Sequence, residues 1–124
     1  MKSLKSLIWI NDRIKNCHCD PSLLKNHRSV DKIVSQIIRT AGLEIVGKAS
    51  HQFDRGYTCV WLLKQSHLSV HSWPEYNFVT LNIEICNFKG DDARKAEKLH
   101  AGLIRLFKPR HSHPKKSTMN LAKT

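Results

Sequence analysis

The sequence predicts an α+β fold: a two-layer sandwich in which two helices cover one face of a mostly antiparallel sheet of four or more strands. Two segments repeat apolar residues at the spacing of a helix, whereas five shorter segments are apolar or alternate polar with apolar residues. Their order along the chain is strand, helix, four strands, helix. A length of 124 residues fits a single domain with one core. Because the second face of such a sheet must be covered or solvated, a dimer is expected.

The first half of the chain predicts one strand, one long helix and a short second strand. Residues 4–10 are mostly apolar and predict the first strand. Residues 16–28 are polar and contain a proline, which indicates a loop. Ser29 is a candidate N-cap and Gly42 a candidate C-cap, and the apolar residues between them repeat at helical spacing. Residues 43–46 predict the short second strand.

The second half of the chain predicts three strands followed by a helix. Residues 58–63 are apolar and typical of a strand. Residues 67–71 and 78–86 alternate polar with apolar side chains, which is the period of a half-buried strand. Residues 91–107 place their apolar side chains on one side of a helix, and Pro109 ends it.

The net charge is strongly positive, because 21 Lys and Arg residues outnumber 10 Asp and Glu residues, which gives +11. Part of the excess lies in residues 108–124, which are poor in apolar residues and predict a loose basic tail after a domain of residues 1–107. Such a charge suggests a nucleic-acid-binding module as an alternative function. Binders of single strands interleave aromatic with basic residues, and the basic tail has no aromatic residue after Phe107. A nucleic-acid partner is therefore not expected.

Targeting signals and cysteines indicate the compartment. No apolar run approaches the roughly 18 residues of a membrane span, and the N-terminal residues lack the apolar stretch of a signal peptide. The four cysteines, Cys17, Cys19, Cys59 and Cys86, have an irregular spacing that demands no disulfide. Cys17 and Cys19 flank His18 like half of a zinc site, but no second pair of ligands stands at suitable spacing, so no metal is expected. These features predict a cytoplasmic protein with reduced thiols.

Residues 65–75 are unusual for a strand, because two His and three Ser lie within eight positions. At a period of two, His67, Ser69 and His71 share a face. A Ser/His hydrolase would need an orienting carboxylate and a sharply turned nucleophile, and no G-x-S-x-G motif is present. A metal site of His67, His71 and Glu75 would not converge at strand spacing. A serine that attacks its own preceding carbonyl, and a strand that merely carries polar side chains, are two further interpretations.

Several residues around this segment match one pattern. Residues 66–76 read Ser-His-Leu-Ser-Val-His-Ser-Trp-Pro-Glu-Tyr, Thr58 stands eight residues before Ser66, and Cys86 stands twenty residues after it. This arrangement, with Phe53 in a matching place, resembles the bacterial and archaeal S-adenosylmethionine decarboxylases. Members of that family are small pyruvoyl-dependent enzymes made as self-cleaving proenzymes, and the predicted order of strands and helices is similar to theirs.

The resemblance implies a self-processing step at Ser66. The Ser66 hydroxyl would attack the carbonyl of Gln65, and the chain would split between these two residues. His71 would accept the α-proton of the serine during elimination, and Thr58 would support the oxyanion intermediate through its hydroxyl. The second product would begin with a pyruvoyl group made from Ser66, so that no metal and no separate cofactor is needed.

The resemblance also implies the reaction, which is decarboxylation of S-adenosylmethionine to S-adenosylmethioninamine for spermidine synthesis. The pyruvoyl carbonyl at Ser66 would form a Schiff base with the substrate amine, and Cys86 would return a proton to the α-carbon. Phe53 would stack on the adenine, Glu75 would accept hydrogen bonds from the ribose, and Trp73 would form the pocket wall or belong to the core. In relatives the active site lies at a dimer interface, so a homodimer of cleaved protomers is implied.

Six positions depart from the family pattern, and two of them, Asn77 and Asn87, replace glycines. Gln65 stands where relatives usually have Glu, Asn82 replaces an Asp, and Glu84 replaces a bulky apolar or aromatic residue. Thr58 replaces a serine, and its β-branch restricts the rotamer of the hydroxyl. These changes leave the cleavage serine in place but fit two alternatives. One is a divergent enzyme that decarboxylates ornithine or arginine, and the other is a proenzyme that never cleaves and has lost its activity.

Overall fold

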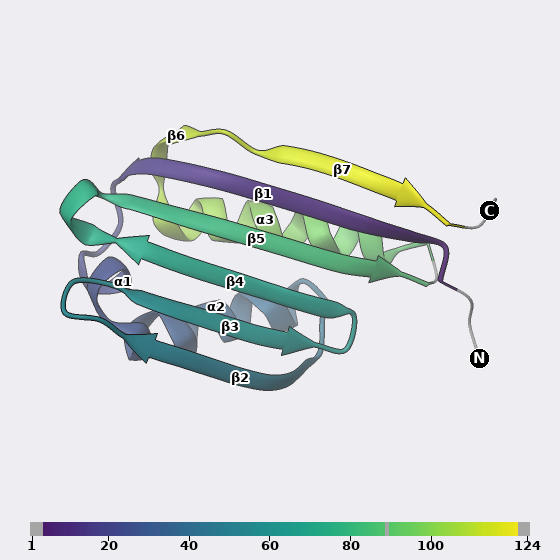
Figure 1. Ribbon diagram of the computed structural model, residues 1–124, viewed down its shortest axis with the longest axis horizontal. Helices are drawn as coiled ribbons and strands as arrows, with labels where there is room; N and C mark the ends of the chain where they lie inside the picture. Colours follow the sequence, from purple (N-terminus) through teal and green to yellow (C-terminus); the bar gives the residue numbers. More distant parts are fainter. Residues whose placement is uncertain (1–3, 89, 122–124) are drawn as a thin grey trace.

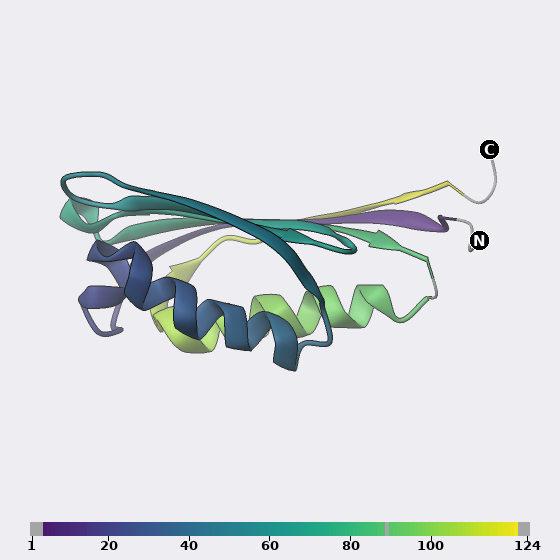
Figure 2. The ribbon, with the colours of Figure 1, turned by 90° about the horizontal axis from the view of Figure 1, so that it is seen from below.

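The computed structural model describes residues 4–88 and 90–121 and shows a two-layer arrangement (Figure 1). Seven strands form one antiparallel sheet, and Figure 2 shows the α-helices beneath a single face of it. The predicted α+β sandwich is thereby confirmed. No helix among the described residues is long and apolar enough to cross a membrane.

The elements follow one another along the chain in this order: β1 (Ser6–Cys17), α1 (Ser22–Lys25), α2 (His27–Thr40), β2 (Ile45–Gln52), β3 (Tyr57–Leu63), β4 (Ser66–Trp73), a 3₁₀ turn (Pro74–Tyr76), β5 (Phe78–Asn87), α3 (Asp92–Phe107), β6 (Pro109–Ser112) and β7 (Lys115–Asn120). Within the sheet the strands lie in the order β2, β3, β4, β5, β1, and β6 and β7 pair one after the other along the outer edge of β1. The strand that begins the chain is therefore a central strand.

On the central strands, buried side chains alternate with partly exposed ones, so the sheet has a buried face and a second face that we call the open face. On β4 and β5 every second side chain is buried beneath the helices, and the side chains between them are partly exposed. The helices complete the core with one apolar side each, from Val30, Val34 and Ile38 on α2 and from Ala96, Leu99, Leu103 and Phe107 on α3. The open face carries His67, Ser69 and His71 from β4 and Thr80, Asn82, Glu84 and Cys86 from β5. The prediction that the three β4 residues share a face is confirmed.

Helix α2 begins earlier than the sequence predicts. Ser29 is the predicted N-cap, but the side chain of Asn26 accepts hydrogen bonds from the backbone N–H groups of Arg28 and Ser29, at 2.8 and 3.3 Å. Asparagine caps helices as well as serine does, and an extended backbone is usual for this position. The predicted end is confirmed, because Gly42 has a φ of +89° and its N–H bonds to the carbonyl of Arg39, as in a Schellman motif.

Strand β1 is longer than predicted, and a short helix occupies part of the predicted loop. The polar residues Asn11 and Asp12 do not end β1, which continues to Cys17. Pairing with β5 on one edge and with β6 and β7 on the other provides backbone hydrogen bonds along nearly this whole length. Helix α1 lies within the predicted loop of residues 16–28, where its two leucines are buried.

The described part of residues 108–124 differs from the loose tail that the sequence predicts. After α3, Lys108 takes a left-handed conformation with a φ of +49°, and β6 and β7 then pair with β1. Apolar alternation could not reveal these strands, because nearly all of their side chains are exposed. Backbone hydrogen bonds hold them instead, and the lysines of β7 are typical of an edge strand that avoids pairing with another chain. The domain therefore continues beyond residue 107.

The buried carboxylate of Asp12 ties the C-terminal strands to the core. It lies 2.7 Å from Nε2 of His100 on α3, and it accepts hydrogen bonds from Ser112 Oγ at 2.7 Å and from the backbone N–H of His113 at 2.8 Å. The Asp12 side chain is fully buried, so these partners replace the water that it lost on folding. This polar cluster explains how a carboxylate can face the helices from the middle of a strand.

Replacing Asp12 with alanine removes the acceptor that these three groups share. We expect the free energy of unfolding to fall by about 3 kcal/mol, because hydrogen bonds to charged groups contribute ~1.5–3 kcal/mol and their donors would stay unsatisfied. Urea unfolding measures this change, and amide hydrogen exchange should accelerate more in β6 and β7 than in β3. The neighbouring exposed substitution Asn11→Ala is the control and should change stability by less than ~0.5 kcal/mol. Equal stability of the Asp12 variant and the wild type would contradict this role.

Candidate active site on the open face

The predicted site residues form two groups at opposite ends of β4. The Ser66 group consists of the predicted residues Gln65, Ser66 and Cys86 together with His67 and Glu84, which lie beside them. The His71 group consists of Phe53, Thr58, His71, Trp73 and Glu75. The Ser66 group lies where β4 begins and β5 ends, and the His71 group lies where β3 begins and β4 ends. Figure 1 shows the start of β4 at the right of the sheet and its end at the left.

The hydroxyl of Ser66 is surrounded by polar side chains of the open face. Ser66 has a φ of +144°, unusual for a residue other than glycine, directly after the turn between β3 and β4. Its Oγ donates to Glu84 Oε2 at 3.3 Å and lies 3.4 Å from His67 Nδ1. The register places Glu84 opposite both His67 and Trp9, and the Trp9 Nε1–H donates to the other carboxylate oxygen.

The carbonyl that precedes Ser66 is held by the neighbouring strand. The oxygen of Gln65 accepts a hydrogen bond from the backbone N–H of Cys86 at 2.7 Å. Such a donor stabilises the negative charge that develops on a carbonyl oxygen under attack. The pKa of the Cys86 thiol is raised, chiefly by burial and further by the carboxylates of Glu84 and Asp92. The thiol is therefore protonated near neutral pH.

The His71 group lines a pocket at the other end of β4. Thr58 Oγ1 lies 3.0 Å from His71 Nδ1, and these two residues are opposite each other in the register of β3 and β4. Phe53, Trp73 and Glu75 line the same pocket, which has a volume of about 280 Å³. Pockets for small molecules usually measure roughly 300–1,000 Å³. This pocket is therefore small for the nucleoside substrate that the resemblance implies.

The local backbone around Gly56 shapes this pocket. A β-carbon at Gly56 would clash with the backbone carbonyl of Ser72, so glycine is required where the chain just before β3 approaches β4. Ser72 Oγ also donates to a carbonyl of α1 at 2.8 Å, which fixes the end of β4. The next residue, Trp73, stacks against His71 and Phe78, with ring centroids 6.2 and 5.3 Å apart. With 39% of its surface exposed, Trp73 is part of the pocket wall and not of the core.

The separation of the two groups limits what one chain can do. Ser66 and His71 are five residues apart on a strand that rises ~3.3 Å per residue, so roughly 16 Å separate them. A hydrolase relay is excluded by geometry, because Ser66 and Glu84 both lie near the same nitrogen of His67, which cannot then pass a proton between them. The metal interpretation finds no support, since His67 lies in one group and His71 and Glu75 in the other.

Comparison with known proteins establishes the family. The sequence profile of the S-adenosylmethionine decarboxylase family matches residues 14–118. The chain belongs to this family. It is 36% identical over 88 residues to the S-adenosylmethionine decarboxylase proenzyme of Archaeoglobus fulgidus. The aligned region covers 70% of this chain and 75% of that protein. The corresponding proenzyme of Aeropyrum pernix is 31% identical over 81 residues, and this alignment covers 65% of this chain and 62% of that protein.

The crystal structure of the adenosylmethionine decarboxylase from Aquifex aeolicus shows the same fold. The TM-score is 0.84 at 20% sequence identity, and the match covers 98% of this chain and 96% of that one. Membership of the S-adenosylmethionine decarboxylase family identifies the chain as a decarboxylase proenzyme, for which self-processing is characteristic. The family match extends into β7, which agrees with a domain that includes the C-terminal strands.

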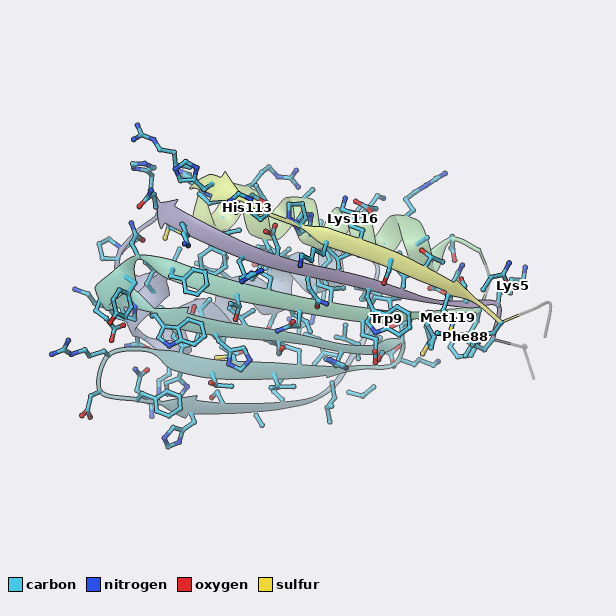
Figure 3. The ribbon with its side chains drawn as sticks, turned by 45° about the horizontal axis from the view of Figure 1, so that its top comes forward. Lys5, Trp9, Phe88, His113, Lys116 and Met119 are labelled. Atoms are coloured by element: carbon cyan, nitrogen blue, oxygen red, sulfur yellow. The ribbon has the colours of Figure 1, made fainter. Side chains whose placement is uncertain are left out.

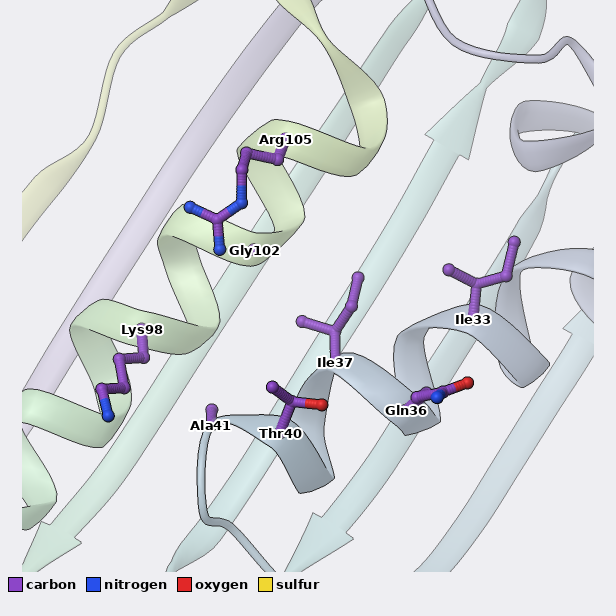
Figure 4. Close-up of a pocket in the computed structure, with 8 residues that line it drawn as sticks. All are labelled: Ile33, Gln36, Ile37, Thr40, Ala41, Lys98, Gly102 and Arg105. Carbon is purple, nitrogen blue, oxygen red and sulfur yellow. The ribbon is translucent and has the colours of Figure 1, made fainter.

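Another cavity of this decarboxylase lies on the helix side of the sheet, between α2 and α3 (Figure 4). Ile33 and Ile37 line it from α2, and the cationic residues Lys98 and Arg105 line it from α3. None of the predicted site residues, all of which the structure describes, contributes to it. The sheet therefore separates this cavity from the candidate site.

Sequence reasoning missed the side chains that surround Ser66, the predicted cleavage serine of this decarboxylase. Glu84 stands out in the sequence only as a departure from the family pattern, and neither His67 nor Trp9 has a predicted role beside it. The three side chains meet because they form one row across β1, β5 and β4. Alternation assigns each of them to the open face, but it does not reveal which residues are opposite one another.

The raised pKa of Cys86 predicts slow alkylation of its thiol at neutral pH. Because a raised pKa lowers the thiolate fraction at any given pH, the rate of reaction with iodoacetamide should reach half of its maximum at a higher pH than for an ordinary thiol of pKa ~8.5. Glu84→Gln removes one charge that raises this pKa, so the rate at fixed pH should increase. Peptide mass spectrometry after labelling distinguishes Cys86 from Cys17, Cys19 and Cys59. A midpoint of reactivity at or below pH ~8.5 would contradict the assignment.

Proposed function

We propose that this chain is a self-processing, pyruvoyl-dependent decarboxylase that cleaves itself between Gln65 and Ser66 and then acts on S-adenosylmethionine. The backbone at the proposed cleavage site carries the proposal. Ser66 has a φ of +144°, and its hydroxyl is hydrogen-bonded to Glu84. The Gln65 carbonyl oxygen accepts the Cys86 N–H. A strained serine behind a polarised carbonyl has the features that attack of its hydroxyl on that carbonyl requires.

In the proposed processing reaction, attack of Ser66 Oγ on the Gln65 carbonyl converts the peptide bond into an ester. Elimination from the ester then requires a base for the α-proton of Ser66, and we assign this role to His71. We assign support of the oxyanion to the hydroxyl of Thr58. The distance of 3.0 Å between Thr58 Oγ1 and His71 Nδ1 supports a joint action of these two side chains.

The roles of His71 and Thr58 require a second copy of the chain. Roughly 16 Å along β4 separate Ser66 from His71, which is too far for proton transfer. If two copies pair by twofold symmetry through their open faces, the His71 group of one copy can meet the Ser66 group of the other. Exposed apolar side chains on this face, among them Leu62 at 54% exposure, favour such a contact. The proposed enzyme is therefore a homodimer with two composite sites.

The composite site offers each remaining residue a role in decarboxylation. Processing turns Ser66 into a pyruvoyl group, whose carbonyl binds the substrate amine and withdraws electrons as CO2 leaves. Cys86, protonated because its pKa is raised, returns a proton to the α-carbon. Phe53, which is 53% exposed, stacks on the adenine beside Trp73, and Glu75 accepts hydrogen bonds from the ribose.

The proposed substrate, S-adenosylmethionine, is the one for which the relatives are named. Its decarboxylated product would serve spermidine synthesis, and we propose that the enzyme acts in the cytoplasm. No residue assigned here requires a metal ion.

Intact-mass spectrometry tests the cleavage. The uncleaved chain has a mass of 14.3 kDa, and processing should yield residues 1–65 and 66–124, the second without a free amine. Ser66→Ala should abolish cleavage because it removes the attacking hydroxyl. Ser69→Ala, on the open face of the same strand, is the matched control and should be cleaved like the wild type. A single uncleaved mass of the wild type after long incubation would contradict the proposal.

Release of labelled CO2 tests the reaction of the cleaved protein. S-adenosylmethionine should be decarboxylated, and Phe53→Ala should raise KM more than it lowers kcat, because the ring binds the adenine away from the reacting carbon. Activity with ornithine or arginine alone would replace the proposed substrate. Cleavage without release of CO2 from any of the three would contradict a decarboxylase activity.

A further inference from the structure

We propose that Glu84 is a catalytic residue of self-processing, whose carboxylate accepts the proton of the Ser66 hydroxyl as that hydroxyl attacks the Gln65 carbonyl. This inference rests on the proposed self-processing and supplies the base for its first step. The base assigned above, His71, acts in the later elimination and lies at the far end of β4 within the same chain.

The position of the Glu84 carboxylate carries the inference. Oε2 accepts the hydrogen bond of Ser66 Oγ at 3.3 Å, while Oε1 accepts that of the Trp9 Nε1–H. Trp9 thus fixes the carboxylate so that its second oxygen points at the serine. Figure 3 shows Trp9 on the half of the sheet that also carries Phe88 and Met119, which is the end where β5 finishes and β4 begins.

The step balances without any further reactant. The hydroxyl proton passes to Glu84 Oε2 while a bond forms between Ser66 Oγ and the carbonyl carbon of Gln65. The electron pair of the carbonyl moves to its oxygen, which already accepts the Cys86 N–H at 2.7 Å. On collapse, the bond from this carbon to the Ser66 nitrogen breaks, and the nitrogen takes up the proton held by Glu84. The products are an ester, a free amine and an ionised Glu84.

His67 is the competing base, because its Nδ1 lies 3.4 Å from Ser66 Oγ. Glu84 is favoured for two reasons. Trp9 holds the carboxylate in place, whereas His67 Nδ1 is shared between Ser66 and Glu84, 3.8 Å from Glu84 Oε2. The titratable groups that face Glu84 are His67 on β4 and Cys86 on β5, and the group that faces it from β1 is the uncharged indole of Trp9.

Pulse-chase analysis of the freshly synthesised chain measures the cleavage rate. Glu84→Gln retains an acceptor for Trp9 but cannot take up the proton, so cleavage should slow by roughly 100-fold or more. Glu84→Asp keeps a carboxylate and should recover part of the rate. Glu97→Gln, which removes an exposed carboxylate of α3 paired with Lys116, is the matched control and should cleave like the wild type.

Two further readouts separate a base from a structural residue. The pH profile of the cleavage rate should differ between Glu84→Gln and the wild type, whereas His67→Gln should keep the wild-type profile. Hydroxylamine splits esters, so it should cleave His71→Ala, which stops after the ester, but not Glu84→Gln, which does not reach it.

Three results would overturn the inference. The first is a Glu84→Gln cleavage rate within about threefold of the wild type, where a lost base should cost ~100-fold. The second is cleavage of Glu84→Gln by hydroxylamine, and the third is a pH profile that changes in His67→Gln but not in Glu84→Gln. A wild-type chain that never cleaves would refute the proposed self-processing itself, so the two failures are distinguishable.

Discussion

Strand β4 keeps Ser66 and His71 apart, because it pairs along its whole length with β3 on one edge and β5 on the other and so stays extended. Each end of β4 consequently receives its partners from different neighbours. Ser66 meets Glu84 of β5, which Trp9 of β1 holds in place, whereas His71 meets Thr58 of β3. A reaction that needs residues from both ends must therefore combine two copies of the chain.

The two faces of the sheet have different physical roles. The helix side buries the apolar side chains and tolerates the carboxylate of Asp12 only because three partners surround it. The open face keeps its polar side chains accessible, which leaves it available for a partner and a substrate. Part of the positive charge of the chain lies at the outer edge of the sheet, where Lys115 and Lys116 are exposed on β7. Lys116 forms an ion pair with Glu97 at 2.8 Å. Charged residues at such an edge hinder pairing with other chains.

The sequence was sufficient to predict the features that burial imposes. Alternation located β4 and β5 because the helices cover one face of the sheet, and helical spacing located α2 and α3 because each buries one side against that face. It could not locate β6 and β7, since their side chains are exposed and backbone hydrogen bonds leave no mark on residue type. The family pattern predicted Ser66, His71 and Cys86 as one set. Their division into two groups, and the contact of Ser66 with Glu84, depend on strand register, which neither composition nor alternation determines.

Co-expression of two variants that do not cleave alone tests the composite site most directly. In a dimer of one Ser66→Ala copy and one His71→Ala copy, one site lacks both residues and the other has both. If the site is composite, the His71→Ala chain should be cleaved in these mixed dimers although it is not cleaved when expressed alone. Mass spectrometry should then detect its two products. Verified mixed dimers in which neither chain is cleaved would contradict the account.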